Sequence, residues 1–129
     1  NHNIETVRGV FHKVRPKGDY DQSLVLLNEV KNLDHTMVTK SGIMVGLGET
    51  KLEIQTTMKD LRDVGCDILT IGQYLRPSSR HFPLHRFYTP EEFDELRDIG
   101  MSFGFKNVAA GPLIRSSYRA EEQMAYALA

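Results

Sequence analysis

The sequence predicts an α/β fold in which parallel strands are joined by crossover helices. Two observations carry this prediction: apolar runs of strand length alternate with helical patterns, and no repeat or linker interrupts the alternation. About three strands are clear, and the tail of a fourth is expected just before Asn1, which is too few to close an eight-stranded barrel. We therefore expect a single partial domain over residues 1–129.

The first helix is expected within residues 19–33. Three apolar residues recur there at helical spacing: Leu24, Leu27 and Val30. Asp19 or Asp21 can cap the start of this helix by accepting hydrogen bonds from its first N–H groups. The apolar run that follows, residues 37–49, is broken by glycines and predicts a buried strand and its exit loop.

The second helix is expected over residues 50–64. Thr50 and Glu53 have the spacing of a capping box, and Gly65 is a typical helix terminator. Five residues are expected to form the core-facing stripe: Leu52, Ile54, Met58, Leu61 and Val64. A short apolar strand then follows over residues 67–72.

The third helix begins after a long polar loop. Thr89 is expected to cap it, with Pro90 in its first turn and Gly104 at its end. Glu91 and Glu92 suit the positive end of the helix dipole. The last strand is expected within residues 105–114, and a closing helix over residues 116–129.

Composition excludes several classes of protein. Apolar residues make up 40% of the chain and charged residues 26%, which argues against disorder. The net charge of -1 implies no bulk attraction to nucleic acid or to an anionic membrane, and no apolar run approaches the roughly 20 residues of a membrane span. Cys66, the single cysteine, excludes an internal disulfide and a multi-cysteine metal site built by this chain alone, and we expect it in the core.

Functional residues of parallel α/β folds gather where the strands end. Gly46 and Gly48 allow a ligand to approach the backbone closely, and Glu49 follows them. The spacing matches neither a Rossmann fingerprint nor a P-loop. A tight strand-to-helix turn and a cofactor loop therefore remain equal alternatives from spacing alone.

Other polar segments also have two interpretations. The amides and imidazole of "NHN", residues 1–3, suit ribose hydroxyls or an amino-acid head group, and equally a turn. Arg15 can clamp a carboxylate, although an exposed arginine is the commoner case. His81 and His85 are an improbable metal pair because Pro83 stands between them. The same loop contains Arg76, Arg80 and Arg86. These arginines favour a solvated basic surface over a binding site for an acidic partner or substrate.

The segment "RSSY", residues 115–118, favours helix capping on local grounds, since hydroxyls at a helix start usually accept backbone N–H groups. Six segments taken together resemble one family, lipoyl synthase, a radical S-adenosylmethionine enzyme. They are "NHNIETV", "KVRP" before "DY", "TKSGIMVGLGET", "GCDILTIGQYLRPS", "YTPEEFDEL" and "VAAGPLIRSSY". They follow the family's order and run from end to end of the chain.

The resemblance implies the C-terminal half of a partial (β/α)₆ TIM-like barrel that works with two [4Fe–4S] clusters and S-adenosylmethionine. In the family, 5′-deoxyadenosyl radicals remove hydrogen atoms from C6 and C8 of a protein-bound octanoyl chain. The auxiliary cluster then gives its sulfur to those carbons. The implied partners are an octanoylated lipoyl carrier domain or H protein and an electron donor such as ferredoxin or flavodoxin. Neither nucleic acid nor a membrane is implied.

Carried over residue by residue, the resemblance implies that Ser116 is a ligand to iron of the auxiliary cluster, beside three cysteines of the family. Arg115 would balance the charge of that cluster, and Ser117 would keep the capping role. Four residues match the strand on the adenine side of the cofactor: Gly42, Met44, Gly46 and Glu49. Asn1 and Asn3 match the strand end that faces the ribose and methionyl groups, and Arg15 is a weaker match for a carboxylate or the substrate channel.

The departure from the family is large, because its two cysteine motifs are absent here. Lacking these motifs, a signal peptide and an initiator Met, the chain is expected to be a piece of a longer cytoplasmic or organellar enzyme and to be inactive alone. The alternative is a half-barrel scaffold without catalysis that recognises a carrier protein.

Overall fold

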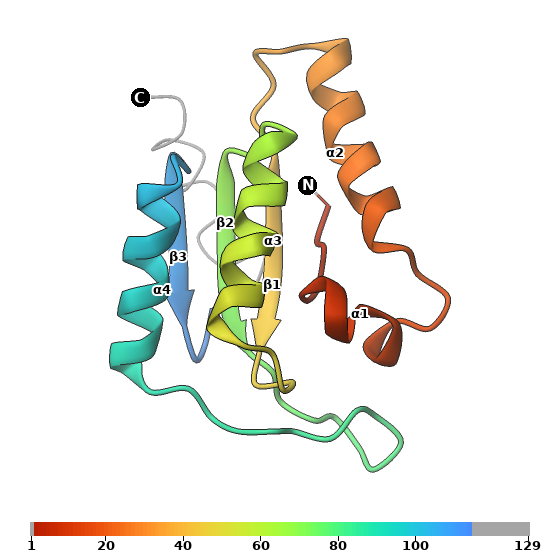
Figure 1. Ribbon diagram of the computed structural model, residues 1–129, viewed down its shortest axis with the longest axis vertical. Coiled ribbons are helices and arrows are strands. Elements are labelled where there is room, and N and C mark those ends of the chain that lie inside the picture. Colours follow the sequence, from red (N-terminus) through yellow and green to blue (C-terminus); the bar gives the residue numbers. More distant parts are fainter. Residues whose placement is uncertain (1, 115–129) are drawn as a thin grey trace.

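The computed structural model describes residues 2–114 (Figure 1). The elements in chain order are α1 (Arg8–Val14), α2 (Tyr20–Leu33), β1 (Lys40–Val45), α3 (Lys51–Asp63), β2 (Ile68–Gln73), α4 (Pro90–Ser102) and β3 (Asn107–Gly111). The predicted α/β class is confirmed. The expected closing helix, residues 116–129, lies outside the described residues.

The strands form one open parallel sheet in the order β1-β2-β3 within the described residues. Helices α3 and α4 are the two crossover connections (Figure 1). This arrangement is consistent with half of a partial barrel. Register pairs Gly42 with Thr70, and Met44 with Gly72.

The expected tail of a further strand is found later than predicted, within residues 2–5. The His2 N–H donates to the Lys40 carbonyl at 3.0 Å, and the Glu5 N–H donates to the Gly42 carbonyl at 3.0 Å. A parallel bridge joins Glu5 to Ile43. This segment therefore covers the outer edge of β1 and brings its polar side chains beside the sheet.

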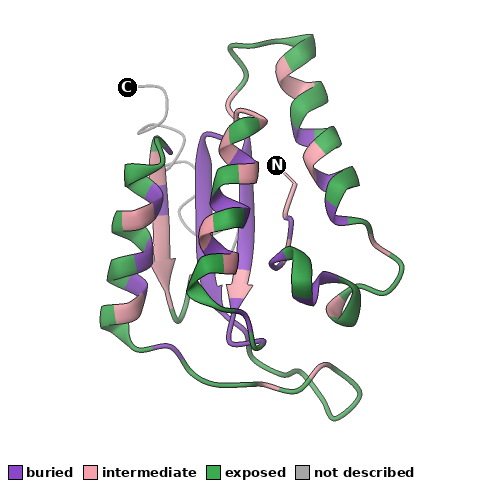
Figure 2. Ribbon diagram, in the orientation of Figure 1, coloured by how far each residue is buried: buried purple, intermediate pink, exposed green. Residues whose placement is uncertain are grey.

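The two faces of the sheet differ in chemistry. Side chains of one face enter the core with α3 and α4, and Figure 2 shows the whole of β2 buried. That core includes Ile43, Ile71 and Val108 from the sheet, and Ile54, Met58, Leu61, Phe93 and Leu96 from the helices. Since side chains alternate along a strand, the opposite face carries Gly42, Met44, Thr70, Gly72, Ala109 and Gly111. We call it the glycine face.

Predicted helix starts are confirmed in detail. The Asp19 carboxylate accepts the N–H groups of Asp21 and Gln22. Full capping boxes are present at Thr50 with Glu53 and at Thr89 with Glu92. These signals are local, because side chain and backbone partner lie within three residues of each other.

One expectation about the helices was wrong, and one helix was not expected. Leu52 is 71% exposed and is not part of the core stripe, because as the second residue of α3 it lies on the outer side of the first turn. The sequence also gave no prediction of α1. This helix has only seven residues and no side-chain cap at Val7, and it buries only Val10 and Phe11.

None of the described helices is both long enough and apolar enough to cross a bilayer.

Candidate functional site

A cavity of about 220 Å³ opens on the glycine face. It lies over the carboxyl-terminal halves of β1 and β2, where ligands of parallel α/β folds bind. Its walls come from the N-terminal segment, both strands and the residues that follow β2. They are Asn3, Glu5, Gly42, Ile43, Met44, Thr70, Gly72, Gln73, Leu75 and Ile114.

Polar atoms converge over Gly42. A Cβ atom at this position would lie 2.5 Å from Oγ1 of Thr70 and 3.1 Å from Oδ1 of Asn3. The Oδ1 atom of Asn3 is buried and has no hydrogen-bond partner among residues 2–114. An orphaned buried acceptor is destabilising, so this oxygen is suited to a hydroxyl or amine of a bound molecule. The missing side chain at Gly42 keeps the required space open.

Glu5 is a site residue that sequence reasoning missed. Its φ of 76° lies in the left-handed region and is the only such value among the described residues other than glycine. Strain of this kind collects at functional sites. Burial raises the pKa of the Glu5 carboxyl, while the positive charge of Arg15 acts in the opposite direction. In the sequence, the only hint of a role for Glu5 is that it lies two residues after Asn3.

Arg15 lies near the same wall of the cavity. Its charge acts on Glu5 and also contributes, after burial, to lowering the pKa of His2. The His2 ring is 3.0 Å from the hydroxyl of Ser23 on α2. An exposed guanidinium close to this carboxyl fits the expected carboxylate clamp, which stays a prediction.

Lys40 lies two positions before Gly42 on the same strand face. Its amine is buried and finds no hydrogen-bond partner in the part of the chain that the structure describes, and burial lowers the pKa of Lys40. No sequence signal marks this residue, since an isolated lysine at a strand start is normally exposed.

The loop after β1 is held by Glu49. Its carboxylate accepts the N–H of Gly46 at 3.1 Å, the N–H of Leu47 at 3.0 Å and the hydroxyl of Tyr88 at 2.6 Å. Glu49 is not among the residues that line the cavity. Its side chain positions the loop after β1 that contains Gly46 and Gly48, which we call the glycine loop. The expected contact of Glu49 with a cofactor stays a prediction.

Position 46 can hold only glycine, because its backbone conformation and its close neighbours leave no room for a side chain. Its φ is 103°, and a Cβ atom would lie 2.6 Å from the Arg86 carbonyl and even closer to the amide of Gln73. That amide donates to the carbonyls of Tyr74 and Arg86, and its oxygen accepts the N–H of Tyr88. Gln73 therefore joins β2 to the segment before α4 while also lining the cavity. Sequence reasoning missed this role.

The described residues do not fit an iron–sulfur cluster. Within residues 2–114, no group of three His, Cys, Asp or Glu side chains is placed to hold a metal ion. Cys66 is buried in the core as expected, and burial raises the pKa of its thiol to about 12. Ser116, the expected iron ligand, and Arg115, expected to balance the charge of the cluster, lie outside the described residues. Asn1, an expected cofactor contact, lies outside them too.

The cavity fits part of S-adenosylmethionine. An unpaired amide oxygen, a hydroxyl and a carboxyl suit its ribose hydroxyls and amino group, and Met44 offers an apolar contact. A volume of about 220 Å³ is smaller than the roughly 300–1,000 Å³ of complete ligand pockets. The cavity is therefore too small for the whole molecule, and a role of the described residues as one wall of such a site stays a prediction.

Comparison with known proteins finds relatives that share one name. The chain is 58% identical over 121 residues to a lipoyl synthase of Caldanaerobacter subterraneus subsp. tengcongensis, covering 94% of this chain and 43% of the relative. The chain is homologous to lipoyl synthases. Lipoyl synthases of Thioalkalivibrio sulfidiphilus and Symbiobacterium thermophilum are each 53% identical, over 95% and 100% of this chain and 38% and 40% of the relatives.

The match to lipoyl synthases confirms the resemblance seen in the six segments. The chain spans about two fifths of the length of these relatives. No protein-family model matches it.

Proposed function

We propose that this chain forms part of a lipoyl synthase, an enzyme that inserts sulfur at C6 and C8 of a protein-bound octanoyl group. The observation that carries the proposal is the 58% identity to a lipoyl synthase over 94% of the chain. We propose that the chain contributes to the reaction at the cavity on the glycine face, which its unpaired polar atoms support. The scaffold alternative has no observation in its favour.

The chain's own residues would bind and orient S-adenosylmethionine. Gly42 and Met44 would receive the adenosine moiety against β1, while Gly46 and Glu49 shape the loop beyond it. Asn1 and Asn3 would contact the ribose and methionyl groups, and Arg15 would attract the methionine carboxylate. We add Glu5, whose carboxyl suits the amino group. When bound, S-adenosylmethionine and the clusters would supply hydrogen abstraction and sulfur.

A role for Ser116 as iron ligand, with Arg115 balancing charge beside it, is proposed from the resemblance. Ser116→Ala in the full-length enzyme should leave cleavage of S-adenosylmethionine largely intact and abolish sulfur insertion. Ser117→Ala is the matched control and should be far milder. Equal lipoyl yield from the Ser116 variant and the wild type would reduce the serine to a helix cap.

Further parts of the proposal follow from the resemblance. The substrate is an octanoylated carrier domain or H protein, the reductant a ferredoxin or flavodoxin, and the location cytoplasmic. Residues 1–129 would form one partial domain that is inactive alone, because the described residues offer no cluster site.

The activity is tested with the full-length protein, reconstituted with iron and sulfide and supplied with S-adenosylmethionine, a reductant and an octanoyl-lysyl peptide. Mass spectrometry should show the gain of two sulfur atoms and the loss of two hydrogen atoms. A peptide that stays unmodified under conditions that cleave S-adenosylmethionine would contradict the proposed activity.

The proposed cofactor site is tested by placing a methyl group in the cavity at Gly42. Gly42→Ala brings a Cβ atom against Thr70 and Asn3, and we expect binding of S-adenosylmethionine to weaken at least about tenfold. Gly111→Ala is the matched control, because Gly111 lies on the same face and does not line the cavity, and among the described residues its Cβ would make only an ordinary contact, 3.4 Å, with the cavity residue Ile114. Equal affinity in the two variants would place the cofactor elsewhere.

A further inference from the structure

The segment between β2 and α4 is a local concentration of positive charge. Residues 75–88 contain Arg76, Arg80 and Arg86 and no aspartate or glutamate, in a chain whose net charge is -1. We call residues 75–88 the basic loop. Figure 1 shows it extending beyond the carboxyl ends of the three strands. It therefore lies at the end of the sheet on which the cavity opens.

Internal hydrogen bonds fix the shape of the basic loop. The Tyr74 hydroxyl donates to the Phe82 carbonyl at 2.5 Å, and the Arg76 guanidinium donates to the carbonyls of Ser79 and His81 at 2.9 Å and 3.0 Å. The His85 N–H donates to the Gly46 carbonyl at 2.7 Å. A loop that is already ordered loses little conformational entropy when it binds a partner.

The positive charges of the basic loop are unequally neutralised. Arg86 forms a bidentate ion pair with Glu92, at 2.9 Å and 2.7 Å. Arg76 makes its contacts to carbonyl groups, which carry no net charge, and Arg80 is exposed. Within residues 2–114 neither of these two arginines forms an ion pair. They are the charges available to a partner.

Apolar side chains flank these charges. Leu75 is 48% exposed at the start of the loop and also lines the cavity, and Phe87 is 64% exposed near its end. Arginine beside exposed aromatic and aliphatic side chains is the composition of protein–protein interfaces. The basic loop thus connects a surface suited to an acidic protein with the wall of the candidate site.

We propose that the basic loop docks an acidic surface of the protein that carries the octanoyl chain, and so directs the acylated lysine toward the cavity. This inference rests on the proposed function. Charge complementarity carries it: Arg76 and Arg80 lack carboxylate partners within the described residues, and Leu75 joins them to the cavity wall. Complementary charges raise association rates and fix the orientation of docking, and salt screens them.

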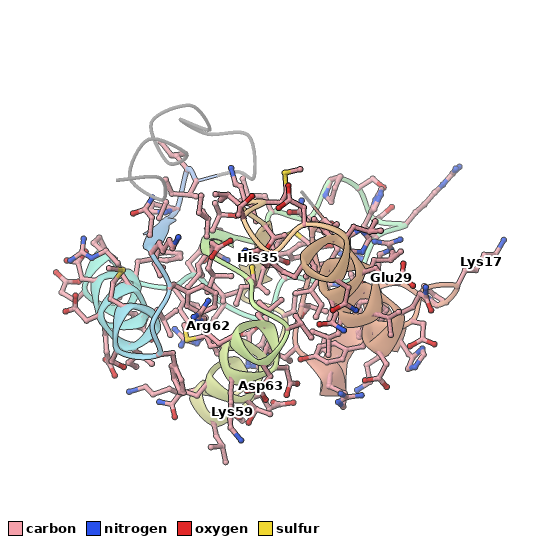
Figure 3. All side chains as sticks on the ribbon, turned by 90° about the horizontal axis from the view of Figure 1, so that it is seen from above. Lys17, Glu29, His35, Lys59, Arg62 and Asp63 are labelled. Atoms are coloured by element: carbon pink, nitrogen blue, oxygen red, sulfur yellow. The ribbon has the colours of Figure 1, made fainter. Side chains whose placement is uncertain are left out.

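The test compares Arg80→Glu with Lys59→Glu in the reconstituted full-length enzyme. Both variants change the net charge equally, and Lys59 lies on α3, where Figure 3 shows it pointing away from the sheet. Each enzyme is given the octanoylated carrier protein and, separately, a short octanoyl-lysyl peptide. Carrier affinity is measured by fluorescence anisotropy at low and high salt, and KM and kcat are measured with both substrates.

We expect Arg80→Glu to weaken carrier binding and raise KM for the carrier about tenfold at low salt, with a smaller effect at high salt. Peptide turnover should be unchanged, and Lys59→Glu should resemble the wild type throughout. Equal carrier affinity in the two variants would overturn the proposal. A parallel loss with peptide and carrier would also overturn it, because the residue would then act on turnover rather than docking. A wild-type enzyme that modifies neither substrate would instead refute the proposed function and the identity of the partner with it.

Discussion

The hydroxyl of Tyr88 donates a 2.6 Å hydrogen bond to Glu49, and both side chains are buried. This bond joins the glycine loop after β1 to the residue that precedes the cap of α4. The Arg86 guanidinium lies over the same tyrosine ring, 3.8 Å from its centroid. Two loops that follow different strands are therefore held as one structure at the carboxyl end of the sheet.

Tyr88→Phe should lower the free energy of unfolding by about 1–2 kcal/mol. The substitution removes only the hydroxyl, keeps the ring beneath Arg86, and leaves Glu49 with its backbone donors Gly46 and Leu47. Chemical denaturation measures the change. An unchanged unfolding midpoint would show that the two loops are held together by other contacts.

Gly46→Ala should be more destabilising than Gly48→Ala. Both glycines have a φ of 103°, which strains any other residue by roughly 1–3 kcal/mol. Only at Gly46 would the new Cβ also meet the Arg86 carbonyl and the Gln73 amide, since at Gly48 its nearest neighbour is His85 at 3.9 Å. Denaturation of both variants isolates the steric contribution, which we expect to be about 1–3 kcal/mol. Equal losses of stability in the two variants would mean that the segment before α4 shifts to make room for the new methyl group at position 46.

Lys40→Met should stabilise the protein by roughly 1 kcal/mol or more at neutral pH, because it removes a buried amine that has no hydrogen-bond partner. The folded-state pKa of Lys40 is lowered from 10.5, so the unfolded chain holds this proton more tightly. The penalty in the native protein is therefore present at neutral pH and is relieved as pH rises through 10.5. Unfolding curves at neutral and alkaline pH should converge for the two proteins. A variant less stable than wild type at neutral pH would contradict this account.

Glu92→Gln tests the ion pair with Arg86 while a side-chain oxygen remains for the Thr89 N–H. Hydrogen bonds from Arg86, then from the Thr89 backbone, lower the pKa of Glu92 to about 2 from 4.5. A lowered carboxyl pKa stabilises above 4.5, and this stabilisation is lost as pH falls toward 2. At neutral pH we expect a loss below about 1 kcal/mol, since water screens this exposed pair.

Glu91→Gln is the control for Glu92, because it removes the same charge from the same turn of α4. Its effect should be smaller and should show a weaker dependence on pH. If both variants lose the same stability at neutral pH, the helix dipole rather than Arg86 accounts for the effect.

Features predicted correctly from the sequence are those determined by neighbouring residues. The capping box of Thr50 with Glu53 needed only a spacing of three, the cap at Thr89 needed only its place before Pro90, and the alternation of apolar runs was enough for the parallel sheet. The reciprocal bond between Glu92 and Thr89 was not predicted. Leu52 was misassigned because it does not share the helical spacing of Ile54, Met58 and Leu61: two residues before Ile54, it lies on the opposite side of the helix.

The candidate site was only partly predictable. Gly42 and Asn3 were identified through a resemblance, and the structure brings them together. Glu5 and Gln73 were missed because their roles depend on contacts distant in sequence and on a backbone conformation that no local pattern encodes.

Cys66 provides a reporter that needs no engineering. The thiol is fully buried beside β2, and burial holds its pKa near 12, so thiol reagents cannot reach its reactive form in the native protein. Within these 129 residues it is the only cysteine, so alkylation here would count openings of the core. The stability variants above can therefore be ranked by the labelling rate of Cys66 itself, read from its own peptide by mass spectrometry, since the longer enzyme is expected to carry further cysteines.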